Sequence, residues 1–162
     1  MFYLQLDIQR YARRRSSSVQ GFRFTRIGQF FNNFYSQFLP FPLTGAQKRV
    51  IKEIRADMAT GHQMNRLLQG DVGSGKTLVA LLTMLIALDN GYQACLMAPT
   101  EILATQHFET MQSLLAPMGV NVRLLTGSTR KKERDEIDAQ LLDGSLHILI
   151  GTHAVIEERV RF

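Results

Sequence analysis

The stretch "LLQGDVGSGKTLVALL", residues 67–82, contains the most specific pattern of this 162-residue chain. A short apolar run leads into a glycine-rich turn, and a second apolar run with helical periodicity follows it. The turn matches the pattern G-x-x-x-x-G-K-[ST], which requires a strand before the turn and a helix after it. We therefore expect a strand over residues 66–69 and a helix over residues 77–89.

The chemistry of this turn points to a phosphate-binding loop. Glycines permit backbone angles that direct successive N–H groups inward, and the start of a helix adds a favourable dipole for anions. Lys76 supplies a cation for the β and γ phosphates, and the Thr77 hydroxyl is placed to ligate magnesium, so these two are the candidate catalytic residues. The expected ligands are ATP and Mg²⁺. The alternative is a glycine-rich turn that binds nothing. The residues expected to contact the nucleotide are Gly70, Asp71, Val72, Gly73, Ser74, Gly75, Lys76 and Thr77.

The composition indicates one α/β domain with a substantial core, since 45% of the residues are hydrophobic and 20% are charged. No apolar run has the length of a membrane span and no secretory signal opens the chain, so we expect a cytoplasmic protein without a membrane partner. The single cysteine, Cys95, excludes a disulfide within the chain. Because it lies in the apolar run 94–98, we interpret it as a packed strand residue, with a reactive thiol as the alternative. The four histidines show no metal-ligand spacing.

The net charge of +5 belongs to the amino-terminal segment. Residues 1–40 contain six arginines and one acid, Asp7, whereas acids and bases balance over residues 41–162. A basic arm beside a neutral core indicates contact with a polyanion such as nucleic acid. The alternative is a solvated helix face joined to a linker.

A Pro-containing connection at residues 39–42 predicts the domain boundary. Residues 1–40 are expected to form a basic, aromatic, helical linker, and residues 41–162 the nucleotide-binding domain. The linker contains Phe30, Phe34 and Phe38 at a spacing that places them on one helix face. We expect this face to pack against the neighbouring domain, with stacking on nucleic-acid bases as the alternative.

Beyond residue 42 the pattern alternates between helices and strands. Thr44 is expected to cap a helix that runs to about residue 59. Because each later strand is a short apolar run and each crossover contains a helix, the sheet should be parallel and flanked by helices. The expected strands are 66–69, 93–98, 121–125 and 147–150, and the expected intervening helices are 77–89, 101–116 and 130–142.

The carboxyl ends of the later three strands are chemically alike. Each is followed by a tight turn that carries a hydroxyl residue, at Thr100, at Thr126 and Ser128, and at Thr152. Open parallel sheets bind ligands at this edge, and short hydroxyls with free N–H groups suit the phosphates of a nucleic-acid backbone. Ordinary helix capping is the alternative for each turn taken alone.

With these features in place, the chain resembles a superfamily 2 helicase motor, and more closely the bacterial RecG-type branched-DNA helicases. The resemblance lies in "LPFPLTGAQKRVIKEI", "MNRLLQGDVGSGKTLVALL", "APTEILATQH", "LLTGS" and "GSLHILIGTHAVIEE". It implies a P-loop NTPase (RecA-like) fold, with Gln47 at the adenine edge and Phe41 packing nearby. It also implies the DNA-facing residues Pro99, Thr100, Thr126, Gly127, Ser128, Gly151, Thr152 and His153.

The resemblance implies a parent protein that is an ATP-dependent DNA helicase or translocase. Such an enzyme remodels replication forks and recombination intermediates, in DNA repair and recombination. The chain departs from the family pattern because it lacks the Asp-Glu-x-His box, and Glu157 and Glu158 do not replace it. We expect a truncated first motor domain, whose partners are branched DNA and the absent second motor domain and wedge domain of the same parent. The piece alone is expected not to turn over ATP, since arginine-finger and magnesium contributions would be missing.

Three other functions are compatible with parts of the pattern. A nucleotide-gated DNA-binding module would bind ATP without hydrolysis, even in a longer chain given branched DNA. A transcription-repair coupling translocase has a similar core. A small nucleotide or metabolite kinase would need an acceptor site and a lid with arginines, for which the sequence gives no signal. The oligomeric state is left open.

Overall fold

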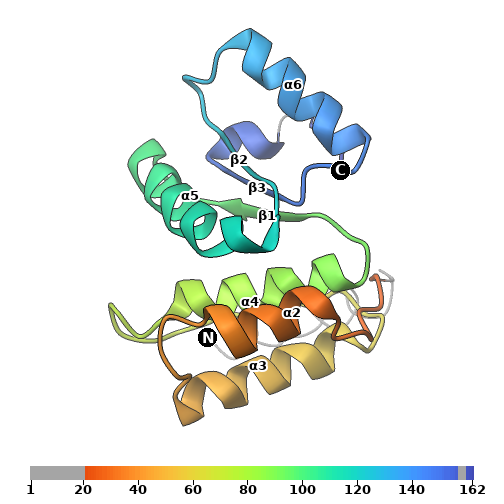
Figure 1. Ribbon diagram of the computed structural model, residues 1–162, viewed down its shortest axis with the longest axis vertical. Helices are drawn as coiled ribbons and strands as arrows, with labels where there is room; N and C mark the ends of the chain where they lie inside the picture. Colours follow the sequence, from red (N-terminus) through yellow and green to blue (C-terminus); the bar gives the residue numbers. More distant parts are fainter. Residues whose placement is uncertain (1–20, 157–159) are drawn as a thin grey trace, which may run out of the picture. The chain divides into compact units, whose positions relative to one another are not determined.

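The computed structural model describes residues 21–156 and 160–162, and Figure 1 shows its helices and strands. Residues 1–20 of the expected helical linker and the acidic pair at 157–158 lie outside the described residues. The described chain divides into two compact units. One comprises residues 21–25 and 43–76, and the other comprises residues 26–42 and 77–162.

The first unit is built around helix α3 (Gly45–Met58), which confirms the helix expected after Thr44. Thr44 and Gln47 form a capping box: the Thr44 hydroxyl accepts from the Gln47 N–H at 3.2 Å, and the Gln47 side chain accepts from the Thr44 N–H at 2.9 Å. Both bonds satisfy amides that a helix start would otherwise leave without acceptors. Ile51, Ile54 and Met58 form the buried stripe of the helix.

The strand expected over residues 66–69 is not formed, so that prediction was wrong. The segment is irregular, and the Leu67 side chain is 90% exposed. A strand needs the main-chain groups of a neighbouring strand, and among the described residues none pairs with this segment.

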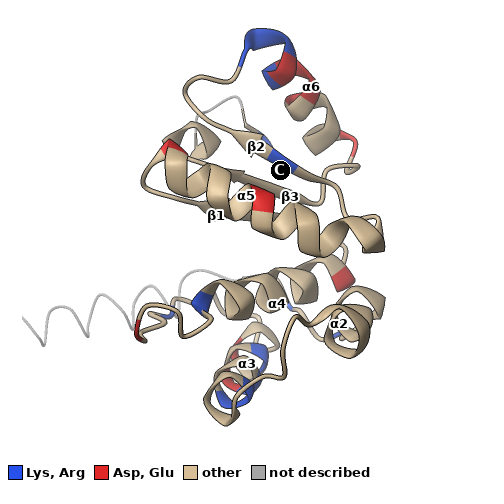
Figure 2. Cartoon of the chain, turned by 60° about the vertical axis from the view of Figure 1, so that its left-hand side comes forward, with Lys and Arg blue, Asp and Glu red and all other residues tan. Residues whose placement is uncertain are grey.

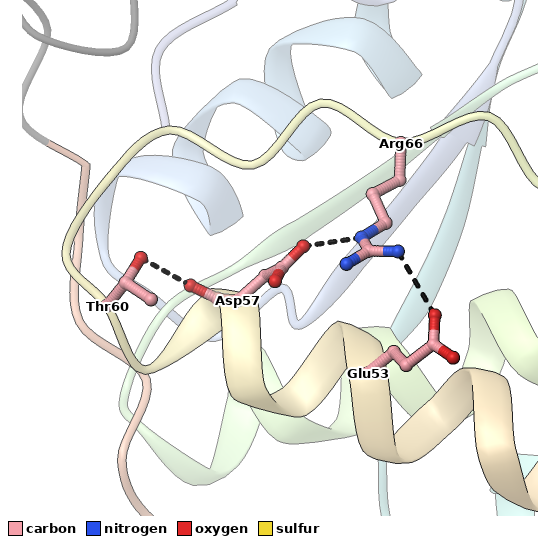
Figure 3. A network of polar contacts seen from close by, with 4 residues as sticks. All are labelled: Glu53, Asp57, Thr60 and Arg66. Atoms are coloured by element: carbon pink, nitrogen blue, oxygen red, sulfur yellow. Dashed lines mark hydrogen bonds and ion pairs between the residues drawn. The ribbon is translucent and has the colours of Figure 1, made fainter.

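The segment is instead joined to α3 through polar side chains, as Figure 3 shows. The Arg66 guanidinium donates to the carboxylates of Asp57 and Glu53, and the Glu53 contact measures 3.2 Å. The Thr60 hydroxyl donates to the Asp57 carbonyl at 2.7 Å, at the end of the same helix. The hydrogen bond from Arg66 lowers the pKa of the Asp57 carboxyl, because it favours the charged form of that group.

The second unit contains a parallel sheet of three strands, β1 (Ala94–Met97), β2 (Val122–Leu125) and β3 (Ile148–Gly151). These confirm the later three expected strands and the α/β fold class. The strand order is β1-β3-β2. β3 is therefore central, and all four of its residues are buried, as its unbroken apolar sequence requires.

Helices flank this sheet. The chain leaves β1 through α5 (Glu101–Leu115) and the short turn η2 (Ala116–Met118), and it leaves β2 through α6 (Lys131–Leu142). The first crossover passes over β3 and the second returns to it. Right-handed connections that run in opposite directions place their helices on opposite faces of the sheet. Figure 1 shows α5 and α6 on either side of the three strands.

The core of this unit lies between the sheet and its helices. Leu149 of β3 packs with the buried side of α6, with Leu125 and with the helical turn η3 (His153–Ile156). Since side chains alternate along a strand, the fully buried Ile148 and Ile150 fill the opposite face. α4 (Lys76–Asp89) is apolar over most of its surface, and nine of its residues are buried.

Cys95 lies in strand β1, as expected, but it is exposed, which corrects the prediction that it is packed. Its strand, β1, lies at the margin of the sheet, and the Cys95 and Met97 side of this strand faces outward. Desolvation by the surroundings nonetheless raises the pKa of the Cys95 thiol to about 11. The alternative reading as an activated thiol is therefore also unsupported, because nucleophilic cysteines have lowered pKa values.

The aromatic stretch forms α2 (Gln29–Asn33) and continues as a π-helical turn, η1 (Phe34–Phe38). Phe34 has no exposed surface, and the centroids of the Phe30 and His147 rings lie 5.8 Å apart. Aromatic side chains of this stretch therefore pack within the protein, as expected. No helix among the described residues is long and apolar enough to cross a membrane.

Candidate functional site

The glycine-rich loop that precedes α4 carries the main candidate site. α4 begins at Lys76, and the Lys76 ammonium folds back over the loop. It donates to the carbonyl oxygens of Gly70 at 2.8 Å and Asp71 at 2.7 Å. The Ser74 N–H donates to the Asp71 carbonyl at 3.1 Å and closes the turn. The loop thus brings a cation to the start of a helix, where an anion is favoured.

Two glycines allow the loop its shape. Gly73 and Gly75 have φ angles of +78° and +79°, a region that other residues rarely adopt. A Cβ added to Gly73 would meet nothing within 4 Å, whereas one added to Gly75 would lie 2.4 Å from the Gln47 amide nitrogen. The backbone angle alone therefore selects glycine at 73, and both the angle and the contact select it at 75.

Gln47 is buried and contacts the loop directly. Its amide nitrogen donates to the Ser74 carbonyl at 2.9 Å, while its amide oxygen accepts from the Thr44 N–H. One side chain thus joins the start of α3 to the phosphate loop. The family resemblance implied a place for Gln47 at the adenine edge, but the sequence did not predict this bridge. An amide has two N–H groups and two lone pairs, so one of each is left for a further ligand. Phe41, its expected neighbour, is about half exposed and belongs to the other unit.

The residues of the loop fit a triphosphate tail. Val72 is fully exposed, so the loop is open to solvent, and the Lys76 ammonium lies over it. Thr77 follows Lys76 in the first turn of α4. The described residues contain no group of three or more His, Cys, Asp or Glu side chains that could hold a metal.

The three hydroxyl-bearing turns meet at one edge of the sheet. The strand register aligns Met97, Gly151 and Leu125, which are the last residues of β1, β3 and β2. The Ala98 N–H donates to the Gly151 carbonyl at 2.8 Å, and the Thr152 N–H donates to the Leu125 carbonyl at 3.2 Å. These bonds extend the ladder into the turns, so the three turns leave the sheet side by side.

The turn after β1 presents Pro99 and Thr100, both exposed. The Thr100 hydroxyl caps α5 by accepting from the Leu103 N–H at 3.3 Å. Capping uses a lone pair of the hydroxyl and leaves its proton available to an external acceptor. The capping reading and the phosphate-binding reading are therefore compatible at Thr100.

The turn after β2 is held by a cluster of hydroxyls. Thr126 is 4% exposed, and its hydroxyl lies 2.9 Å from that of Ser128. The Thr126 N–H donates to the Thr129 hydroxyl at 2.9 Å. Gly127 and Ser128 are exposed. Of the residues predicted here, Gly127 and Ser128 form the surface of the turn. Thr126 is buried and holds the turn through its hydrogen bonds to Ser128 and Thr129.

Arg134 of α6 supports this turn from its carbonyl side. Its guanidinium donates to the carbonyls of Thr126 at 2.7 Å, Thr129 at 3.1 Å and Gly127 at 3.3 Å. Sequence reasoning missed Arg134, because a basic residue within a charged helix gives no signal of its own. It also missed Glu101, whose carboxylate accepts from the Ser128 N–H at 3.2 Å. The acid in the first turn of α5 was the available signal, but it indicated only a helix start.

The turn after β3 is the most buried of the three. A Cβ on Gly151 would lie 1.9 Å from the Leu125 carbonyl oxygen, so only glycine fits there. Thr152 is half-buried, and His153 is exposed at the start of η3. Of the three predicted residues, Thr152 and His153 therefore remain accessible through their side chains.

A basic group adjoins the turn after β2. Arg130, Lys131 and Lys132 are exposed at the start of α6, and Figure 2 shows this end of the helix in blue. Cations beside a turn of hydroxyls and amides suit a phosphodiester backbone, which takes hydrogen bonds and charge together.

Comparison with known proteins gives the same picture. A family model for DEAD/DEAH box helicases matches residues 44–161. The chain belongs to this helicase family. ATP-dependent DNA helicase RecG of Synechocystis sp. is 49% identical over 99% of this chain, and RecG of Bacillus subtilis is 47% identical over 98%. A solved structure of RecG bound to a three-way DNA junction matches 99% of this chain with a TM-score of 0.89 at 42% identity.

These findings confirm the expected resemblance to RecG-type helicases and the RecA-like fold of the family. The matched regions are 19% of the Synechocystis protein, 23% of the Bacillus protein and 22% of the solved chain. The chain thus spans about a fifth of the length of the curated relatives it matches.

Proposed function

We propose that this helicase-family chain is the nucleotide- and DNA-binding part of an ATP-dependent helicase that acts on branched DNA. Its relatives in Synechocystis and Bacillus subtilis are named ATP-dependent DNA helicases, and the similar solved protein is bound to a three-way DNA junction. In the whole protein, a second motor domain and a wedge domain would act together with this chain on the junction.

The phosphate loop would bind the nucleotide. The Lys76 ammonium would move from the Gly70 and Asp71 carbonyls to the β and γ phosphate oxygens, exchanging neutral acceptors for charged ones. Thr77 would hold magnesium, which would supply positive charge beside the phosphates when bound. Gln47 would hold the loop through its hydrogen bond to the Ser74 carbonyl, and it would offer its remaining N–H and lone pair to the base.

The DNA backbone would lie along the carboxyl edge of the sheet. The observation that carries this proposal is the register that aligns Met97, Gly151 and Leu125, since it gathers three separate hydroxyl turns. Single turns of this kind are ordinary helix starts, whereas an aligned set can follow successive phosphates. The cations at the start of α6 would extend this track beyond the turn after β2.

Binding of a fluorescein-labelled three-way DNA junction, followed by anisotropy over a range of salt concentrations, tests the proposal. The double variant Lys131→Ala/Lys132→Ala should weaken binding. It should also reduce the magnitude of the slope of log K against log salt by about two, since each phosphate contact contributes about 0.9. Lys48→Ala/Lys52→Ala is the matched control, because both lysines are exposed on α3 in the other unit.

Equal losses in the two double variants would show that binding follows net charge alone and would contradict a track at the sheet edge. The expected result is a loss confined to the α6 variant, while the control binds like the chain without substitutions, called the parent chain below. Circular dichroism of each variant verifies that the helices are retained.

A further inference from the structure

Glu101 occupies the amide side of the turn after β2. One oxygen of its carboxylate accepts from the Ser128 N–H at 3.2 Å, and the other accepts from the Ser128 hydroxyl at 3.1 Å. A two-oxygen anion therefore takes one main-chain amide and one hydroxyl. Phosphodiester oxygens are bound by the same pair of donor types in protein–DNA contacts.

The turn does not depend on Glu101 for its shape. On the opposite side, Arg134 binds the carbonyls of three of its residues, and the hydroxyls of Thr126, Ser128 and Thr129 bond to one another. A turn fixed from its carbonyl side keeps its amide side directed outward. The Ser128 donors would thus remain in place if the carboxylate left.

Glu101 is held in a way that allows exchange. It is exposed, it is the first residue of α5, and both of its bonds to Ser128 lie at the surface. Surface interactions of a carboxylate compete with water and are weak. Gly127 permits the approach, because a Cβ there would lie 3.3 Å from the nearer carboxylate oxygen.

We infer that the Glu101 carboxylate is a built-in substitute for a DNA phosphate at Ser128, and that it competes with the DNA backbone for this subsite. The inference rests on the proposed function, since it concerns the same sheet edge. DNA binding would displace the carboxylate, and its return would help to expel the backbone. Such an internal competitor keeps each contact reversible, which suits a protein that must release and rebind DNA.

The alternative is that Glu101 has a purely structural role in this part of the protein. If Glu101 served to hold the turns after β1 and β2 at the spacing that DNA requires, its removal would weaken DNA binding. The competitor predicts stronger binding after its removal. The sign of the change therefore separates the two roles.

The experiment compares Glu101→Gln with the parent chain in binding a fluorescein-labelled oligothymidylate, by anisotropy. Gln retains the length and shape of the side chain but removes the charge that competes with phosphate. We expect binding to strengthen about fivefold, the effect of one unit charge at short range in a highly solvated site. Glu109→Gln is the matched control, since Glu109 is exposed on the same helix and lies apart from the turn in sequence.

A second readout follows the amide of Ser128 by ¹H–¹⁵N NMR during the same titration. Its resonance should shift on addition of the oligonucleotide, at lower concentrations in Glu101→Gln than in the parent chain. Thermal unfolding of each variant shows whether the fold is retained.

The possible outcomes are distinct. Tighter binding by Glu101→Gln alone, together with the Ser128 shift, supports the competitor. DNA binding that is the same in Glu101→Gln and Glu109→Gln, or weaker in Glu101→Gln, overturns the competitor while the proposed function stands. If no variant binds the oligonucleotide, the proposed DNA edge fails, and the competitor fails with it.

Discussion

Asp89 is expected to stabilise the helical structure of α2, at the start of the aromatic stretch. It ends α4 and is buried, and its two carboxylate oxygens accept from the Phe30 N–H at 2.9 Å and the Phe31 N–H at 3.1 Å. These amides begin α2, whose own N-cap residue, Gly28, has no side chain with which to cap them. A Cβ at Gly28 would lie 2.6 Å from the nearer Asp89 oxygen, so the missing side chain makes room for the carboxylate.

The size of the effect follows from these bonds. A hydrogen bond to a charged group contributes about 1.5–3 kcal/mol, and loss of a helix cap costs about 1 kcal/mol. Because the two bonds share one carboxylate and act as one cap, we expect Asp89→Ala to destabilise the local structure by about 3 kcal/mol. Such a loss corresponds to an increase on the order of 100-fold in the population of the open state.

Native-state hydrogen exchange by NMR measures this population at the Phe30 and Phe31 amides. Asp89→Asn keeps one acceptor and should lose about half of the effect in free energy. Gly28→Ala should have an effect of the same sign, since its Cβ displaces the carboxylate. Asp135→Ala, an exposed acid on α6, is the control. If hydrogen exchange at the Phe30 and Phe31 amides is as slow in Asp89→Ala as in Asp135→Ala, the Asp89 carboxylate does not stabilise the start of α2.

Three further predictions concern single side chains. Gln47→Glu keeps the acceptor of the capping box but loses the donor to the Ser74 carbonyl, so affinity for an ATP analogue should fall about fivefold by calorimetry, the value of one hydrogen bond. Burial lowers the pKa of His147, whose Nδ1 accepts from the Asn121 N–H at 2.9 Å. The contribution of the neutral imidazole to the free energy of unfolding is therefore complete above pH 6.5 and is lost as the pH falls through the folded-state pKa. Urea titrations of the unsubstituted chain and of His147→Gln over this pH range measure the loss. The Cys95 thiol should alkylate slowly at neutral pH, with a rate that rises until about pH 11.

Each of these has a clear contrary result. Unchanged affinity in Gln47→Glu, with Lys48→Ala as the reference on the same helix, would separate Gln47 from the loop. An identical loss of stability in acid for the parent chain and His147→Gln would remove the role of the imidazole. Alkylation of Cys95 that levels off near pH 8.5, as for an ordinary thiol, would contradict the desolvation of its surroundings.

The local pattern of the sequence predicted most of the second unit and the start of α3 in the first unit. The later strands, the helices between them, the Thr44 cap and the three aligned turns all follow from periodicity, capping residues and the rule that parallel strands share a carboxyl edge. These features depend on residues that are close in sequence. The family resemblance added the positions of Gln47 and the DNA-facing turns.

What the sequence did not predict depends on neighbours that are distant in sequence. A strand at residues 66–69 requires a pairing partner, and apolar character alone does not supply one. The exposure of Cys95 follows from the strand order β1-β3-β2, which periodicity does not specify. The cap that Asp89 gives to α2 joins residues 59 positions apart, and the Glu101 contact with Ser128 joins residues 27 positions apart.

The loop at residues 70–77 is proposed to bind the phosphates of a nucleotide through the Lys76 ammonium. Isothermal titration calorimetry of the unsubstituted chain with a non-hydrolysable ATP analogue, with and without magnesium, measures this binding. We expect magnesium-dependent binding that Lys76→Ala weakens at least tenfold, about 1.4 kcal/mol, while Lys52→Ala leaves it unchanged. Absence of binding by the folded parent chain, or equal binding by Lys76→Ala, would contradict the account.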